Sequence, residues 1–171
     1  MLAAESAAVA FNPLPWMVLV PAVGAVVVAM LPRTRARADV VKAVALGFAG
    51  VSGALSVYLL TAFETHESGF QFVVNEKWIP SWGIGWHLGV DGISLFLLVL
   101  TGLLFPLAIA GVKPDHDDKP YYAWLLLLMA GSMGVFVALD LVLFFAFFEI
   151  VLVPMYFLIG LWGHGDKVYA A

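Results

Sequence analysis

The run LVLFFAFFEIVLVPMYFLIGLW, from Leu141 to Trp162, decides the fold class of this chain. About 20 apolar residues, rising 1.5 Å each along a helix, cross the ~30 Å hydrocarbon core of a bilayer. Glu149 is the only charged side chain in the run, and it falls near the middle. The run therefore predicts a transmembrane helix that carries one carboxyl group close to the bilayer midplane.

The composition extends this interpretation to the whole chain. Of the 171 residues, 63% are hydrophobic and 12% are charged, and the mean hydropathy is +1.01. These values are typical of an integral membrane protein. Because the hydrocarbon core offers the backbone no hydrogen-bond partners, only helices or a closed barrel can span it, and continuous apolar runs favour helices. We expect an all-α integral membrane protein.

Hydropathy predicts five transmembrane helices, at residues 14–31, 40–63, 93–112, 121–139 and 141–162. Loop charge sets their orientation. Seven of the eight basic residues fall on one side of the predicted membrane, namely Arg33, Arg35, Arg37, Lys42, Lys113, Lys119 and Lys167. Lys77 alone falls on the other side. The positive-inside rule then places the N-terminus outside and the tail inside.

These spans divide the chain into three parts. Residues 1–63 hold helices one and two, residues 64–92 form an outer loop, and residues 93–171 hold helices three to five, which open a larger helix bundle. Within the loop, the alternating run FQFVV at residues 70–74 predicts a short strand or hairpin. Trp78, Trp82 and Trp86 are interpreted as an aromatic belt at headgroup level, with a binding role as the alternative.

Small residues mark the second and fourth spans. Gly47, Gly50 and Gly53 lie on the second span, and Gly131 and Gly134 lie on the fourth. Since small residues let helix backbones approach closely, we expect both spans to pack against neighbouring helices.

Glu149 is the first candidate for function. A charged group at a helix centre costs about 2.5 to 3.5 kcal/mol on insertion scales, so it is normally paired, hydrated or protonated. Burial favours the neutral form of a carboxyl and a nearby cation favours the ionised form, so such a group can pass on a proton. Pro154 leaves the Ile150 carbonyl without its helical donor, which predicts a kinked or loosened turn beside the carboxyl. The alternative for Glu149 is a static ion pair or a hydrogen-bonded packing role.

Two aspartates precede apolar runs and are interpreted as N-caps. Asp140 stands before the fifth span and Asp91 before the third, where a side-chain oxygen can accept free backbone N–H groups. Proton exit near either aspartate is the alternative.

No metal site is expected, because the run PDHDDK around His116 lacks the spacing of a known site and His66, His87 and His164 lie in loops or ends.

Several classes of function are excluded by what the sequence lacks. Without cysteine the chain offers no ligands for iron–sulfur clusters, so we expect no redox centre or cofactor on it. No phosphate-binding loop or nucleophile elbow is present, and the basic residues flank membrane spans instead of forming a nucleic-acid face.

None of the five spans carries a deeply placed cation to pair with Glu149. The partner therefore lies in another subunit or in a C-terminal continuation, which the run WGHGDKVYAA at residues 162–171 favours.

Three segments carry a family resemblance. The runs FFEIVLVPMYFLIGLWG (147–163), LGVDGISLFLLVLTGLLFPLAI (88–109) and GVFVALDLVLFF (134–145) resemble the antiporter-like proton-translocating subunits, called subunit M or chain 4, of NADH:quinone oxidoreductase, respiratory complex I. The resemblance implies a subunit of about fourteen transmembrane helices with a line of charged residues at mid-membrane. In that line Glu149 pairs with a lysine two helices later, and the present sequence is similar to the first third of such a subunit.

The resemblance also implies the partners. NADH, FMN, iron–sulfur clusters and quinone belong to other subunits of the complex, and this chain contacts other membrane-arm subunits within a bacterial cytoplasmic membrane or a mitochondrial inner membrane. Two alternatives stay open: a large subunit of an Mrp-type cation/proton antiporter or membrane-bound hydrogenase, and a non-transporting membrane scaffold that uses Glu149 to pair helices.

Overall fold

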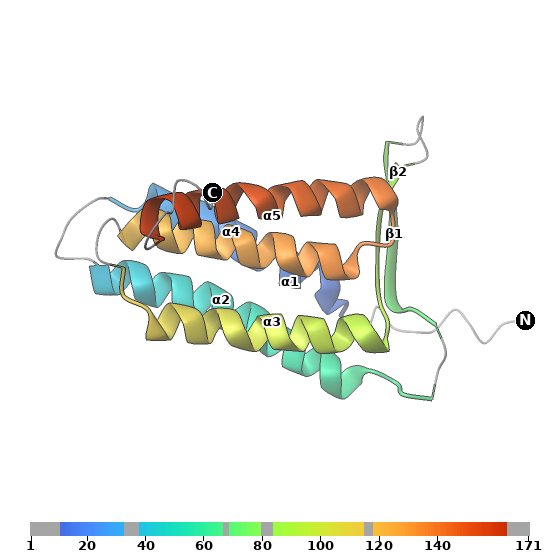
Figure 1. Ribbon diagram of the computed structural model, residues 1–171. Helices are drawn as coiled ribbons and strands as arrows, with labels where there is room; N and C mark the ends of the chain where they lie inside the picture. Colours follow the sequence, from blue (N-terminus) through green and yellow to red (C-terminus); the bar gives the residue numbers. More distant parts are fainter. Residues whose placement is uncertain (1–10, 33–37, 67–68, 80–83, 115–117, 164–171) are drawn as a thin grey trace, which may run out of the picture.

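The protein is an antiparallel bundle of five helices with a β-hairpin across one end (Figure 1). This computed structural model describes residues 11–32, 38–66, 69–79, 84–114 and 118–163. The helices are α1 (Pro13–Met30), α2 (Ala38–Ala62), α3 (Gly92–Gly111), α4 (Asp118–Val137) and α5 (Leu141–Trp162). Each is long and apolar enough to cross a membrane. Their ends lie within three residues of the predicted spans, and the all-α membrane class is confirmed.

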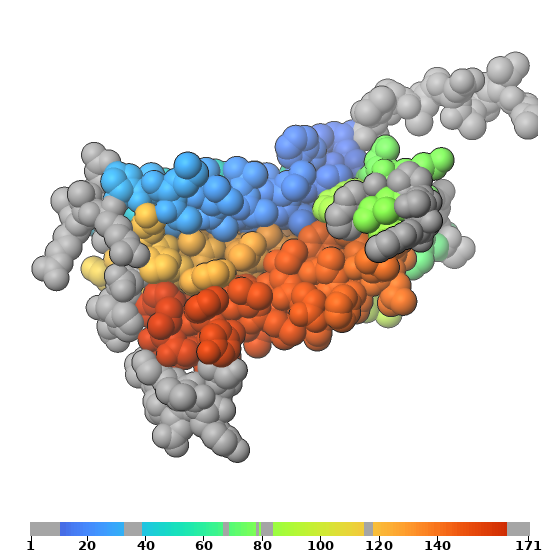
Figure 2. Space-filling model, turned by 90° about the horizontal axis from the view of Figure 1, so that it is seen from above, coloured from blue at the N-terminus to red at the C-terminus, as the bar shows by residue number. Residues whose placement is uncertain are grey.

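Helix α4 forms the centre of the bundle. It contacts α1, α2, α3 and α5, and it contributes the fully buried side chains of Leu126, Met129 and Met133 to the core. Helix α5 lies at the edge of the bundle and packs mainly against α4, with β2 touching one of its ends. The space-filling view shows α1, α4 and α5 side by side on one face (Figure 2). One side of α5 is therefore left uncovered along most of its length.

The β-hairpin consists of β1 (Gln71–Ile79) and β2 (Ile84–Val90), paired antiparallel. It confirms the strand or hairpin expected from the run at residues 70–74. The hairpin is fixed to the connection between α4 and α5, because the Leu139 amide donates to the His87 carbonyl at 2.8 Å and Leu88 forms a bridge with Ala138. The helix ends thus hold the hairpin as a cap on the bundle.

One predicted belt tryptophan has a different place. The Trp86 ring meets the Phe147 ring of α5 edge to face, with centroids 5.8 Å apart, and it packs against the core. Its partner is therefore protein, so the belt interpretation does not account for its position. The Trp78 side chain and Trp82 lie outside the described residues.

The prediction of close packing at small residues is confirmed at three glycines and wrong at two. A methyl group at Gly134 would overlap the Phe147 ring, one at Gly131 would lie 2.9 Å from Val151 Cγ2, and one at Gly53 would overlap the Gly102 carbonyl oxygen. The first two glycines bring α5 onto α4, and the third brings α3 onto α2. Gly47 and Gly50 face open space.

Two lysines donate hydrogen bonds to backbone carbonyls at helix ends, on the side of the bundle opposite the hairpin. The Lys42 ammonium donates to the carbonyls of Ala110 and Val112 at the end of α3, at 2.7 and 3.2 Å. The Lys119 ammonium donates to the Leu31 carbonyl at the end of α1, at 2.6 Å. The last carbonyls of a helix lack intrahelical donors and carry partial negative charge, so a cation stabilises them. Each lysine therefore joins the start of one helix to the end of another.

A serine on α2 compensates for a proline on α1. Pro21 has no N–H, so the Met17 carbonyl, four residues earlier, loses its helical donor. The fully buried Ser52 hydroxyl donates to this carbonyl at 2.6 Å and also approaches Met133 Sδ at 3.3 Å. An unsatisfied carbonyl in hydrocarbon costs several kcal/mol, so this contact makes Pro21 compatible with a membrane span.

We expect Ser52→Ala to lower the free energy of unfolding by about 1 kcal/mol, because the Met17 carbonyl loses its donor. In a Pro21→Ala background the loss should shrink, since the backbone N–H of the introduced alanine donates to that carbonyl. Denaturation of the detergent-solubilised protein, followed by circular dichroism across the four variants of this cycle, measures the coupling.

Ser132→Ala is the matched control, because that hydroxyl donates at 2.8 Å to the Leu128 carbonyl, which has its ordinary helical donor. Equal destabilisation by Ser52→Ala with and without Pro21 would contradict the proposed compensation.

Candidate functional site

Glu149 lies well inside the membrane-spanning part of α5. It follows Leu141 by eight residues, which places it about 12 Å along the helix at 1.5 Å per residue. Asp39, Lys42, Asp118 and Lys119, the charged residues of the other described helices, all lie within five residues of a helix end. Glu149 is therefore the one deeply placed charge among the described helices.

The rotation of α5 sets the direction of this carboxyl. Phe147 is buried against α4, and at 100° per residue Glu149 is turned about 200° from it. The carboxyl consequently points away from α4 and out of the five-helix unit. Phe145, Val153 and Tyr156 occupy the same outward face, and all three are exposed.

Within this chain, the described residues leave the Glu149 side chain exposed. Those residues also give it no ion-pair or hydrogen-bond partner. The physical reason is the edge position of α5, which packs mainly against α4. Any group that pairs with the carboxyl has to approach the outward face of α5 from beyond the described residues.

Pro154 lies apart from the carboxyl. Its ring is buried, about 140° around α5 from Glu149 on the side that faces α4. Helix α5 continues through Pro154 from Leu141 to Trp162 without interruption (Figure 1). The loosened turn expected beside Glu149 therefore does not interrupt the helix, and the Pro154 ring contributes to packing against α4.

Four contacts fix the rotation of α5 on α4, and sequence reasoning identified none of them as part of the site. Two are the close approaches of Gly134 to Phe147 and of Gly131 to Val151. The other two are aromatic, with Trp124 stacked on Phe157 at 4.7 Å and Tyr121 edge to face with Trp162 at 5.4 Å. The spacing of three between Gly131 and Gly134 was the available signal, since it places both on one helix face.

Asp91 and Asp140 are both N-caps, as predicted. Asp91 Oδ1 accepts from the Ser94 amide at 2.8 Å, and the Ser94 hydroxyl accepts from the Asp91 amide at 2.9 Å, which forms a capping box. Asp140 Oδ1 accepts from the amides of Val142 and Leu143 at 2.8 and 3.1 Å. Asp140 Oδ2 lies 3.4 Å from the Gly85 amide, so it also contacts the hairpin.

These hydrogen bonds stabilise the ionised form of both aspartates. They lower the pKa of Asp91 chiefly through Ser94, and that of Asp140 chiefly through the Leu143 amide. Because the folded-state pKa values are lowered, the stabilisation is present above the unfolded value of about 3.9 and is lost as pH falls through the folded value. The hydrogen bonds to the first amides of α3 and α5 account for both aspartates as caps.

The histidines do not assemble into a metal site in the part of the chain that the structure describes. His66 lies in the turn after α2 and His87 in β2, near Asp140. His116 and His164 fall outside the described residues. No group of three or more potential metal ligands occurs within residues 11–32, 38–66, 69–79, 84–114 and 118–163.

Comparison with known proteins identifies relatives of this chain. No family model matches the chain. Subunit M of the NADH-quinone oxidoreductase of Rhodobacter capsulatus is 45% identical over 131 residues, which cover 76% of this chain and 25% of that protein. Chloroplastic chain 4 of the NAD(P)H-quinone oxidoreductase of Chara vulgaris is 36% identical over 165 residues, which cover 94% of this chain and 33% of that protein.

Solved structures show the same fold. A chain of respiratory complex I from Thermus thermophilus with bound NADH superimposes with a TM-score of 0.73 at 25% identity, over 92% of this chain and 31% of that one. A chain of the archaeal membrane-bound sulfane sulfur reductase superimposes with a TM-score of 0.71 at 21% identity, over 92% and 24% of the two chains. The second likeness concerns the fold alone.

The match covers a limited part of the relatives. The chain spans about a quarter to a third of the length of the curated proteins that it matches. Within that part, the chain is 36–45% identical to the two curated proteins, and it shares its fold with the chain of complex I at 25% identity. The chain is therefore a homologue of the subunit M and chain 4 proteins of NADH-quinone oxidoreductases, as its sequence segments indicated.

Proposed function

We propose that this chain belongs to the proton-translocating membrane part of an NADH:quinone oxidoreductase and that Glu149 transfers the proton. The observation that carries the proposal is the placement of Glu149, a deep carboxyl on the outward face of a helix that packs against the bundle on its other side. The homology to subunit M and chain 4 proteins supports the choice of complex.

The energetics of the outward face support a functional role. A carboxylate at this depth costs a few kcal/mol unless it is paired, hydrated or protonated, so ionisable groups inside membrane spans are retained mainly for function. Neighbouring Phe145, Val153 and Tyr156 supply no charge to compensate it. The protonation state of Glu149 therefore depends on what approaches that face.

A partner cation would explain how the protonation state of Glu149 depends on what approaches its face. A lysine brought to the outward face of α5 favours the ionised carboxyl, and its withdrawal favours the protonated one. The two groups then titrate as a pair, and movement of the cation causes Glu149 to bind and release a proton. Electron transfer from NADH to quinone takes place in partner subunits, which hold the FMN and the iron–sulfur clusters, and it reaches this chain as a change in the pairing.

Two other functions share this fold. The likeness to the sulfane sulfur reductase shows that the fold also occurs outside quinone reductases, in keeping with an Mrp-type antiporter or a membrane-bound hydrogenase subunit as the second candidate. Copurification with flavin and iron–sulfur subunits supports the quinone reductase, whereas proton movement driven by a salt gradient without them supports the antiporter. A scaffold would tolerate Glu149→Gln, because glutamine keeps the hydrogen-bonding capacity.

The ends of the bundle support a membrane orientation. The hairpin covers one end of the bundle (Figure 1), and Lys42 and Lys119 contact the ends of α3 and α1 at the other. By the positive-inside rule, the hairpin and the N-terminus face outward and the lysines face the cytoplasm of a bacterial cell.

Glu149→Gln should reduce proton translocation to background while the protein still assembles, because the amide neither binds nor releases a proton at neutral pH. Glu149→Asp should retain part of the activity. The measurement is NADH-driven acidification of sealed inverted membrane vesicles that contain the whole complex, with assembly followed on native gels. Full pumping by the glutamine variant would refute the role of Glu149.

Asp140→Asn should leave proton translocation nearly unchanged, because the asparagine oxygen can still accept from the amides of Val142 and Leu143. Asp140→Ala should cost about 1 kcal/mol of stability through loss of the cap. The same vesicle assay and a thermal unfolding curve test the pair. If Asp140→Asn assembled normally but no longer pumped, the carboxyl itself would carry protons.

A further inference from the structure

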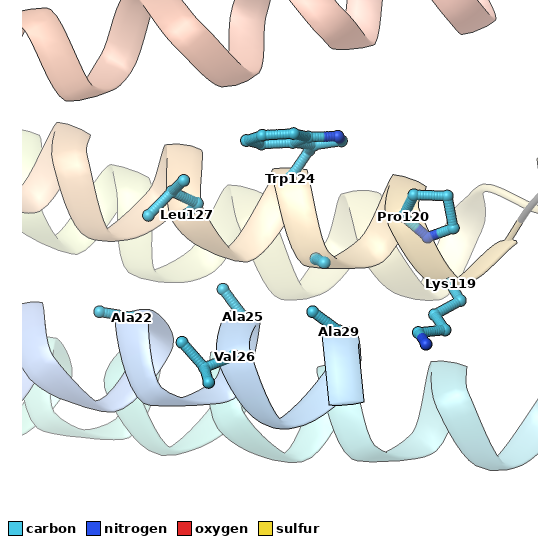
Figure 3. A pocket seen from close by; sticks show the side chains of 9 residues that line it. Ala22, Ala25, Val26, Ala29, Lys119, Pro120, Trp124 and Leu127 are labelled. Atoms are coloured by element: carbon cyan, nitrogen blue, oxygen red, sulfur yellow. The ribbon is translucent and has the colours of Figure 1, made fainter. Parts of the chain in front are cut away.

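A groove between α1 and α4 is not explained by the proposed proton chemistry. It encloses about 380 Å³ and runs along both helices (Figure 3). Ala22, Ala25, Val26 and Ala29 line it from α1, and Lys119, Pro120, Ala123, Trp124 and Leu127 line it from α4. From Lys119 to Leu127 the groove extends about 12 Å along α4, from the end of the helix toward the middle of the span.

The polarity of the lining residues changes along the groove. Four alanines leave space between the two helices where larger side chains would fill it. Pro120 and Lys119 close the end that lies at the boundary of the span, and the Lys119 side chain extends there toward α1 (Figure 3). Trp124 lies about 7.5 Å deeper along the helix axis. The groove is thus apolar within the membrane and cationic at its surface.

The Lys119 ammonium has capacity beyond its role at the end of α1. It donates to the Leu31 carbonyl at 2.6 Å, and this is its one hydrogen bond to the residues that the structure describes. An ammonium group has three N–H donors. The bond to Leu31 fixes the cation at the mouth of the groove and leaves donors for an anion.

We propose that this groove binds an anionic phospholipid, with an acyl chain along the alanines and the headgroup phosphate at Lys119. Charge complementarity decides the occupant, since a basic site between helices on the cytoplasmic side suits an acidic lipid headgroup. A transmembrane helix seated there would satisfy the apolar lining but would leave the cation at the mouth without an anion. The proposal stands independently of proton transfer at Glu149.

Photocrosslinking tests the site in the complex as purified from membranes. The complex is reconstituted into nanodiscs with phosphatidylglycerol that carries a diazirine on its acyl chain, or with the matching phosphatidylcholine. After illumination, peptide mass spectrometry locates the lipid adducts. We expect adducts at residues 22–29 and 119–127, with phosphatidylglycerol favoured about fivefold, the preference that one lysine near the surface confers.

Two variants probe the two ends of the groove. Lys119→Gln should reduce the preference for phosphatidylglycerol to none and leave the adducts with phosphatidylcholine. Ala29→Leu should lower the adducts of both lipids several-fold, because the larger side chain fills the groove. Lys113→Gln and Ala108→Leu are the matched controls, since neither residue lines the groove and both should retain the pattern of the unmodified protein.

Two outcomes would overturn the proposal. One is adducts spread evenly over lipid-exposed positions such as Leu103 and Leu107 of α3, with no enrichment in the groove. The other is enrichment that survives both Lys119→Gln and Ala29→Leu.

Discussion

The fold depends on the absence of water in the hydrocarbon core, because every backbone polar group there needs a partner within the protein. Helix formation meets most of this requirement, and the exceptions show how the bundle is joined. Where Pro21 frees the Met17 carbonyl, Ser52 donates to it from α2. Where α1 and α3 end, lysines from α4 and α2 donate to the last carbonyls. Polar contacts between helices are few, and they occur at helix ends or prolines, where the backbone pattern is interrupted.

The direction of Glu149 follows from packing instead of from polar contacts. Gly131 and Gly134 let the backbone and the Phe147 ring of α5 approach α4, and the stack of Trp124 on Phe157 fixes the same helix farther along. A residue two positions after Phe147 then has to point away from α4. Side chains that never touch the carboxyl thus determine where it is presented, and a larger residue at Gly134 would displace the face that carries it.

Hydropathy predicted the five helices within three residues because the length and polarity of a span are local properties of the sequence. The caps at Asp91 and Asp140 were equally local, since the residue type and its place before an apolar run determine them. The rotation of each helix in the bundle and its packing against its neighbours are not local properties of the sequence. The packing of Pro154 against α4, the open space at Gly47 and the place of Trp86 against Phe147 all depend on which helix lies beside which.

The exposed carboxyl is compatible with the proposed mechanism, in which the protonation of Glu149 responds to a distant event. A glutamate fully enclosed by its own bundle would have a fixed environment, and its protonation would follow pH alone. Glu149 lies on a face that the described chain leaves open, so its electrostatic environment is set by whatever packs against α5. In the proposed mechanism, small movements of a cation on that face would change the relative stability of the two protonation states, because charge interactions are weakly screened in the membrane. In the proposed mechanism, the bundle contributes a rigid support with a fixed direction, and the variable element is the cation that approaches the outward face of α5.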